Sequence, residues 1–195
     1  KAKAVELLSL VGIPEPEARI NSAGCPACTP SYNELLRETY GARLEEFCPD
    51  CRERYERNPR RMFDCKVESC LEILRGAPSI LESLCDDCAA HFEEVQSLLS
   101  GMKTRFSVDT SMARGLDYYT RTVFEVHYGG LGAQSALCGG GRYDGLVEEL
   151  GGQPMPACGV SGGVERLIST LDDLGLMAEG EPGPDFYLVT LDGGS

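Results

Sequence analysis

Eight of the ten cysteines in this 195-residue chain form four close pairs, and this pattern constrains the fold more than any other feature. Three pairs have the spacing C-x-x-C and one has C-x4-C. They are Cys25 with Cys28, Cys48 with Cys51, Cys65 with Cys70, and Cys85 with Cys88. The C-x-x-C spacing lets two thiolates take adjacent corners of a tetrahedron, and four thiolates at about 2.3 Å from the metal complete a structural zinc site. We therefore expect one or two structural Zn²⁺ ions.

The spacing leaves open which pairs share an ion, because four pairs combine into two quartets in about three ways. Ordinary buried thiols, or disulfides in an oxidised sample, are the alternative. The short helices around the cysteines offer little apolar area, so metal would supply much of their stability. We expect His91 to lie on a helix face rather than bind metal, and Cys138 and Cys158 to be small buried residues.

The charge of the chain limits how it binds nucleic acid. A formal net charge of -13 excludes attraction of phosphates to the whole surface, so any RNA contact needs a local basic patch. Five arginines within ten positions form a candidate patch: Arg52, Arg54, Arg57, Arg60 and Arg61. The alternative is a solvated helical face balanced by Glu53 and Glu56.

No membrane or export signal is evident in the sequence. No apolar run approaches the roughly 20 residues that span a bilayer, and the first residues lack the order of a signal peptide. We expect a cytoplasmic protein that does not contact a membrane. In a reducing cytosol, ten cysteines favour metal binding or burial over disulfides.

The hydrophobic pattern divides the chain into four segments. Residues 1–24 predict a helix that Gly12 and Pro14 end, followed by a strand at about 18–21. Residues 25–108 predict helices throughout, with Thr29 and Pro30 as a cap and first-turn proline and with breaks at Asn58-Pro59 and Gly76-Ala77-Pro78. Because the chain opens inside a helical pattern and stops after an apolar strand, we expect both ends to be cut.

The remaining residues have a different character, since 18 of the 23 glycines lie at or after Gly115. Residues 109–180 predict a strand at 122–126, a second at 157–161, and an amphipathic helix at 164–174 that Gly175 caps. Residues 181–195 predict a linker and a strand at 186–191 that opens another domain.

Basic residues are sparse after Phe106, which suggests that each binds a specific anion. They are Arg114, Arg121, Arg142 and Arg166. An arginine fork matches phosphate or carboxylate oxygens in two places, and neighbouring glycines let a phosphate approach the backbone. Structural ion pairs are the alternative. Three of the four lie in distinctive stretches: RGLDYYT at 114–120, GGGRYDGL at 139–146, and GVSGGVERL at 159–167.

In this order, the three stretches resemble histidyl-tRNA synthetases. The first resembles the histidine-specific signature of that family, the second its glycine-rich strand and turn, and the third motif 3 of class II aminoacyl-tRNA synthetases. Residues 1–24 resemble the helix and strand before the insertion domain of the family, and residues 25–108 resemble a cysteine-rich form of that insertion. Residues 184–189 resemble the first strand of the anticodon-binding domain.

The resemblance implies an α+β fold, with part of a class II antiparallel sheet, flanking helices and a small, mainly helical, zinc-binding insertion. It implies ATP-dependent activation of histidine, with Mg²⁺, and transfer to tRNA(His). Arg114 would contact the α-phosphate as the catalytic cation, and Arg166, near the start of its helix, would hold the ATP end. Tyr118 and Tyr119 would line the histidine pocket with Tyr143 close by, the alternative being core packing.

The resemblance also implies limits. The arginine patch of the insertion would touch the acceptor arm of tRNA(His). The family is homodimeric, so we expect a homodimeric parent protein. Motif 1, which builds the dimer interface, and motif 2 are absent from these residues. We therefore expect this piece to be inactive alone and to have open sheet edges. Two alternatives remain: a synthetase-like regulatory paralogue of histidine biosynthesis, and a non-catalytic, zinc-dependent RNA-binding module.

Overall fold

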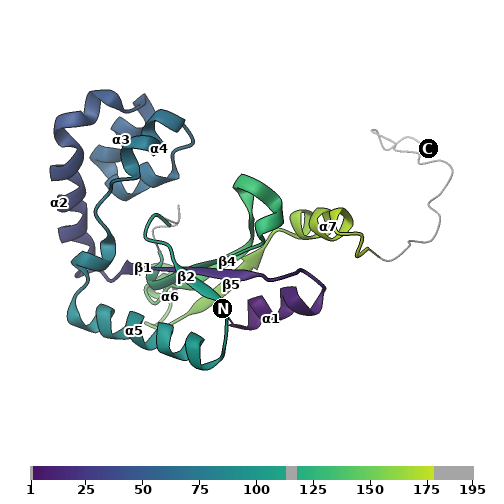
Figure 1. Cartoon of the computed structure of the whole chain (residues 1–195). Helices are drawn as coiled ribbons and strands as arrows, with labels where there is room; N and C mark the ends of the chain where they lie inside the picture. The colour runs from purple at the N-terminus through teal and green to yellow at the C-terminus, as the bar shows by residue number, and fades with distance from the viewer. Residues whose placement is uncertain (1, 113–117, 178–195) are drawn as a thin grey trace, which may run out of the picture.

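The computed structural model describes residues 2–112 and 118–177. Its centre is a five-stranded sheet in the order β2-β1-β3-β4-β5 (Figure 1). The strands are β1 (Glu17–Gly24), β2 (Phe106–Val108), β3 (Thr120–His127), β4 (Ala136–Arg142) and β5 (Cys158–Gly162). β1 and β2 run parallel, and the other neighbouring strands run antiparallel.

The strand register gives the sheet an apolar face and a polar face. Ile20 pairs with Phe124 and Ala18 pairs with Val126, and all four side chains are buried. The residues between them point to the other face, where Arg19 pairs with Glu125. The polar face is therefore available to a site, while the apolar face forms part of the core.

Helices cover the apolar face. α1 (Ala2–Leu10) and α5 (Asp86–Gly101) lie below the sheet in Figure 1, and α7 (Val164–Asp173) follows β5. Leu8 of α1 and Phe92 of α5 belong to one hydrophobic cluster with Ile20 and Phe124, and Leu167 of α7 packs against it. Two short helices, η4 (Gly129–Gln134) and α6 (Leu146–Glu149), connect the later strands.

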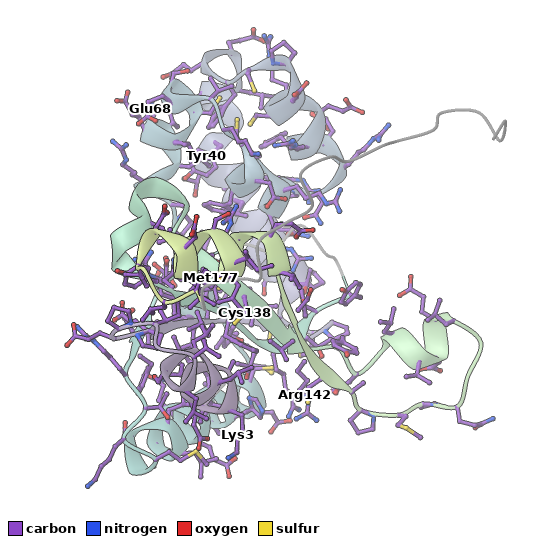
Figure 2. All side chains as sticks on the ribbon, turned by 90° about the vertical axis from the view of Figure 1, so that its right-hand side faces the viewer. Lys3, Tyr40, Glu68, Cys138, Arg142 and Met177 are labelled. Atoms are coloured by element: carbon purple, nitrogen blue, oxygen red, sulfur yellow. The ribbon has the colours of Figure 1, made fainter. Side chains whose placement is uncertain are left out.

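A helical insertion leaves the sheet at the end of β1 and lies above it in Figure 1. Its elements are α2 (Thr29–Tyr40), η1 (Gly41–Glu46), α3 (Pro49–Arg57), η2 (Pro59–Asp64), α4 (Glu68–Leu74) and η3 (Ile80–Ser83). A separate hydrophobic cluster holds them together, and in it the rings of Tyr40 and Phe47 meet edge to face at 5.5 Å. Figure 2 shows Tyr40 and Glu68 in this insertion, above Cys138 and Arg142 of the sheet.

The mixed architecture of a sheet with flanking helices confirms the predicted fold class. α3 ends at Arg57, before the Asn58-Pro59 break, and α4 ends at Leu74, before Gly76. Gly175 has a φ of +66 just after α7, and its N–H donates to the Asp172 carbonyl, as expected of a glycine that ends a helix. The strand predicted at 186–191 lies outside the described residues.

Two local predictions were wrong. Residues 25–108 are not helical throughout, because Phe106–Val108 forms β2, where Phe106 packs against the sheet cluster and β1 offers an edge. Thr29 is not the cap of α2: the N-cap is Cys28, and the Thr29 hydroxyl donates to the Cys25 carbonyl instead. Within the described residues, no helix is both long and apolar enough to span a membrane.

Candidate functional site

The structure gathers the eight paired cysteines into two quartets. The first, which we call the junction cluster, is Cys25, Cys28, Cys85 and Cys88, and the second, the module cluster, is Cys48, Cys51, Cys65 and Cys70. Within each quartet, all four Sγ atoms lie within 4.8 Å of one another. The grouping therefore selects one of the three pairings that the spacing left open.

The sulfur distances match a tetrahedral metal site. The Sγ of Cys25 lies 3.6 Å from that of Cys28 and 3.9 Å from that of Cys85, and the Sγ atoms of Cys48 and Cys65 are 3.8 Å apart. Corners of a tetrahedron with arms of about 2.3 Å lie about 3.8 Å apart. All eight residues are unbridged thiols, so the quartets have the donor set and spacing that zinc requires.

Backbone N–H groups surround both clusters. The N–H of Cys85 donates to Cys28 Sγ at 3.2 Å, and the N–H of Cys48 donates to Cys70 Sγ at 3.3 Å. Burial disfavours the thiolate of Cys25, but the N–H groups of Cys28 and Ala27 outweigh it and lower the pKa of Cys25 to about 7. These donors stabilise negative sulfur, the form that binds metal.

Burial and neighbouring thiols raise the pKa of Cys51 and of Cys88. Four thiols cannot all ionise at such short range without a cation between them, because the four negative charges would repel one another in a buried site. A divalent ion would remove that repulsion and draw the protons off.

The remaining cysteines and His91 lie outside the two quartets. Cys138 is half-buried against the sheet cluster. Cys158 is exposed, so the prediction that it is buried was wrong; it lies on β5, whose partner among the described strands is β4 alone. His91 of α5 lines a cavity of about 510 Å³ with Arg142 and Cys158. Within the part of the chain that the structure describes, neither that histidine nor those cysteines joins a candidate metal group.

The three tyrosines singled out in the sequence lie together. Ring centroids are 4.9 Å apart for Tyr118 and Tyr119, 5.6 Å for Tyr118 and Tyr143, and 6.2 Å for Tyr119 and Tyr143. Two come from the residues before β3 and the third follows β4, so strand pairing brings the two motifs into one aromatic group. Their role in binding histidine stays a prediction.

Glycines on neighbouring strands make room for these rings. Gly141 of β4 pairs with Gly159 of β5. A Cβ at position 141 would lie 2.7 Å from Cδ1 of Tyr119, and a Cβ at 159 would lie 2.5 Å from the hydroxyl of Tyr143. Real Cβ atoms essentially never approach this closely, so only glycine at these positions lets the two tyrosines come this near to the strands.

Arg142 forms an internal ion pair beside the tyrosines. Its Nε lies 2.7 Å from Oδ2 of Asp144, and the N–H of Asp144 donates to the Thr120 hydroxyl. Both charged side chains are about two-thirds buried. The pair therefore ties the end of β4 to the start of β3 next to Tyr119 and Tyr143.

Two arginines, Arg114 and Arg166, are predicted to hold ATP. Arg114 lies outside the described residues. Arg166 lies in the first turn of α7, is exposed, and donates from Nη1 to the Ala136 carbonyl at 3.0 Å. This bond holds the guanidinium against the start of β4, at the other end of the strand from Arg142.

The arginine patch divides into three environments. Arg54, Arg57 and Arg61 line a hollow of about 620 Å³ with two acidic residues. Arg57 forms an ion pair with Glu53 at 3.1 Å within this hollow, and Arg52 forms one with Glu45 at 3.0 Å. The fifth, Arg60, lines an open cavity of about 650 Å³ on the other side, together with Cys25 and Tyr119. The cavity at Arg60 thus brings one patch residue, one candidate zinc ligand and one pocket tyrosine together.

A polar network that the sequence reasoning missed lies near Arg166. His127 Nδ1 is 2.7 Å from the Ser135 hydroxyl, and His127 Nε2 is 3.0 Å from Glu125 Oε2. Since the carboxylate only accepts, Nε2–H donates to Glu125; in the neutral imidazole Nδ1 then accepts from the Ser135 hydroxyl. Ser135 precedes Ala136, the residue that holds Arg166. Alternation of Glu125 and His127 on one strand was the sequence signal for this contact.

Comparison with known proteins gives the family. A sheet with flanking helices and an inserted helical module defines the chain as part of a class II aminoacyl-tRNA synthetase. The model for the family described as histidyl-tRNA synthetase matches residues 60–167, more than half of the chain. The chain belongs to the histidyl-tRNA synthetase family.

Relatives agree with this assignment. The chain is 49% identical to a histidine--tRNA ligase of Caldanaerobacter subterraneus subsp. tengcongensis over 95% of its own length and 45% of that protein. It is 47% identical to that of Moorella thermoacetica over 97% of its length and 45% of that protein. The chain thus spans under half the length of these relatives.

Solved structures share the fold. The apo histidyl-tRNA synthetase of S. aureus matches with a TM-score of 0.70 and 33% identity, over 91% of this chain and 43% of that one. A Bacillus halodurans protein described as an ATP phosphoribosyltransferase regulatory subunit/histidyl-tRNA synthetase matches with a TM-score of 0.56 and 19% identity, over 88% and 48%. At that identity, the second likeness concerns the fold alone.

Proposed function

We propose that this chain supplies part of the active site of a histidine-tRNA ligase, which joins histidine to ATP and passes the histidyl group to tRNA(His). The observation that carries the proposal is the group of Tyr118, Tyr119 and Tyr143 over Gly141 and Gly159. Tyrosine offers an apolar wall with a polar tip, which suits the imidazole ring of histidine. Membership of the family supports the same assignment.

ATP, bound with Mg²⁺, is the proposed second substrate. Both steps build negative charge around phosphate, so fixed cations are the expected means of stabilising it. We assign Arg166 to the ATP end, since its Nη1 is held at the Ala136 carbonyl in the first turn of α7 and helix N-termini favour anions. Arg114, by resemblance, would contact the α-phosphate, and Tyr119 and Tyr143 would bound the histidine side.

Two structural zinc ions complete the proposal. The junction and module clusters would each hold one Zn²⁺ through four thiolates, and the Sγ distances of 3.6 to 3.9 Å support this assignment. Elemental analysis of protein purified under reducing conditions should find two zinc ions per chain. Eight titratable thiols in a folded, zinc-free sample would contradict it.

The tRNA would contact the insertion through its arginines. Arg54, Arg57 and Arg61 line one hollow and so present several guanidinium groups to adjacent phosphates, which suits an acceptor arm. We further propose that the protein acts in the cytoplasm as a homodimer, and that activity needs the sequence that the relatives carry beyond this chain. The segment boundaries at 24/25, 108/109 and 180/181 are part of this proposal.

The decisive experiment is histidine-dependent exchange of labelled pyrophosphate into ATP by the full-length protein. Exchange that requires histidine and is lost in Tyr119→Ala shows that the adenylate forms at this site. Binding of histidine and ATP without exchange would point instead to a regulatory paralogue of histidine biosynthesis. Unchanged exchange in Tyr119→Ala would remove the tyrosine group from the active site.

A second candidate function is RNA binding by the insertion without chemistry, which the hollow at Arg54, Arg57 and Arg61 favours. Salt-dependent tRNA binding with no histidine-dependent exchange would support it. Failure to bind tRNA even at low salt would exclude it.

A further inference from the structure

The junction cluster lies where the insertion leaves the sheet and where it returns. Cys25 directly follows Gly24, the last residue of β1, and Cys28 is the N-cap of α2. Cys85 is the N-cap of α5, and Cys88 lies in its first turn. α5 then packs on the apolar face of the sheet through Phe92 and Leu99. One metal ion at this cluster would therefore join both connections of the insertion to the sheet.

The two connections already touch closely at this point. The Sγ of Cys25 lies 3.9 Å from that of Cys85, and the Cys85 N–H donates to Cys28 Sγ. Gly24 has a φ of +68, and a Cβ there would lie 2.9 Å from Cβ of Cys28. The turn out of β1 is thus too tight to tolerate a side chain, and it aims the first C-x-x-C pair at the start of α5.

The module cluster has a different position. Its four ligands all fall between Cys48 and Cys70, and three of them belong to the hydrophobic cluster of the insertion, with Cys48 packed against it. The sheet has its own hydrophobic cluster, in which none of these cysteines takes part. A metal ion at the module cluster would therefore hold the insertion together internally without fixing its orientation on the sheet.

The cavity beside the junction cluster connects it with the proposed histidine pocket. Its lining includes Tyr119 and Thr120, where β3 begins, Asn33 and Arg37 of α2, and Cys25 of the junction cluster. The lining thus comes from both the sheet and the insertion, so the width of the cavity depends on the angle between them. The junction cluster lies at the corner where that angle is set.

We propose that the two zinc ions have separate roles: the junction ion fixes the orientation of the insertion over the Tyr119 pocket, and the module ion stabilises the fold of the insertion. This inference rests on the proposed function for its two zinc ions. Loss of the junction ion should open the cavity of about 650 Å³ while the insertion keeps its own fold and its own ion.

The chain offers a matched pair of variants, Cys85→Ser and Cys48→Ser. Each residue is half-buried, is the N-cap of a helix in extended conformation, and donates its N–H to a thiol of its own cluster. Serine is a favourable N-cap, so each change removes one ligand without weakening the start of the helix. Both variants would be made in the full-length protein.

Zinc content, hydrogen exchange and aminoacylation would be measured for both variants. We expect each to retain one zinc ion per chain. In Cys85→Ser, hydrogen exchange should become faster for amides in 24–30, 85–89 and 119–121, while the amides of α3 and α4 stay protected. Its kcat/KM for tRNA should fall by about a hundredfold, as expected when the insertion is misplaced over the active site. Cys48→Ser should expose α3 and α4 while the junction amides stay protected.

Two results would overturn the division of roles: loss of both ions in either variant, or the same exchange pattern in both. Absence of zinc from the unchanged protein would also overturn it. Zinc content and hydrogen exchange could behave as expected while the unchanged protein shows no histidine-dependent exchange of pyrophosphate into ATP. In that case the enzymatic proposal fails and the structural roles of the ions stand.

Discussion

Gly141 and Tyr119 approach so closely that no side chain fits between them: a Cβ at position 141 would lie 2.7 Å from the tyrosine ring and 2.8 Å from the Thr122 carbonyl oxygen. Position 141 of the glycine-rich strand β4 therefore has room only for glycine. The ring of Tyr119 occupies the volume that a side chain would take.

Gly141→Ala should displace Tyr119 and distort β3. Overpacking of this kind lowers the free energy of unfolding by about 1–3 kcal/mol. The displaced ring should also raise the KM for histidine more than the KM for ATP. Urea unfolding and pyrophosphate exchange with varied histidine measure both effects. Gly145→Ala is the control, because nothing lies within 4 Å of a Cβ there. Equal behaviour of the two variants would disprove the role of the close approach.

Arg166→Lys should weaken ATP binding and leave histidine binding unchanged. Lysine keeps the charge but loses the planar fork, whose Nη1 donates to the Ala136 carbonyl and whose geometry matches phosphate oxygens. We expect the KM for ATP to rise about tenfold, the loss of about one charge-assisted hydrogen bond. Exchange kinetics with varied ATP test this, with Asp173→Asn at the exposed end of α7 as control. A selective rise in the KM for histidine would contradict the assignment.

Replacing Arg54, Arg57 and Arg61 together by glutamine should weaken tRNA binding and its salt dependence. The slope of log K against log salt should fall by about 0.9 for each phosphate contact to duplex lost. Filter binding at several salt concentrations measures the slope. A control variant replaces Arg43 and Arg75, which lie outside the hollow and form ion pairs with Glu46 and Glu68; because it removes two charges rather than three, the slopes are compared per charge removed. An unchanged slope would leave the patch as a solvated face.

Replacing either of two buried tyrosines of the insertion by phenylalanine should affect stability differently. The Tyr32 hydroxyl donates to the Pro78 carbonyl at 3.0 Å, whereas among the described residues the buried Tyr40 hydroxyl has no hydrogen-bond partner. Tyr32→Phe should therefore destabilise the insertion by about 1 kcal/mol, while Tyr40→Phe should be neutral or stabilising. Thermal unfolding of the zinc-loaded protein compares them.

The same tyrosines predict a loss of stability at high pH. Burial raises the pKa of Tyr32 and of Tyr40 above the usual value of about 10. The folded state then holds these protons more tightly than the unfolded state, so the stabilisation is complete below about pH 10 and is lost as pH rises above it. The Tyr32→Phe variant should show a weaker alkaline loss. An equal loss in both proteins would place the titrating group elsewhere.

Local sequence was sufficient for many elements of this protein. Helix breaks at Asn58-Pro59 and Gly76 follow from backbone restrictions that act within one or two residues. The C-x-x-C pairs and the three motifs likewise depend on short spacing, so the candidate metal ligands and the family could be predicted from the sequence alone.

Contacts between distant residues depended on the tertiary structure. The chain path, not the spacing, brings Cys25 to Cys85 and Cys48 to Cys65, and the register of β3, β4 and β5 places Tyr119 over Gly141 and Tyr143 over Gly159. The physical reason is that local spacing fixes only which side chains share a turn or a strand face. Which faces meet depends on burying two separate hydrophobic clusters at once.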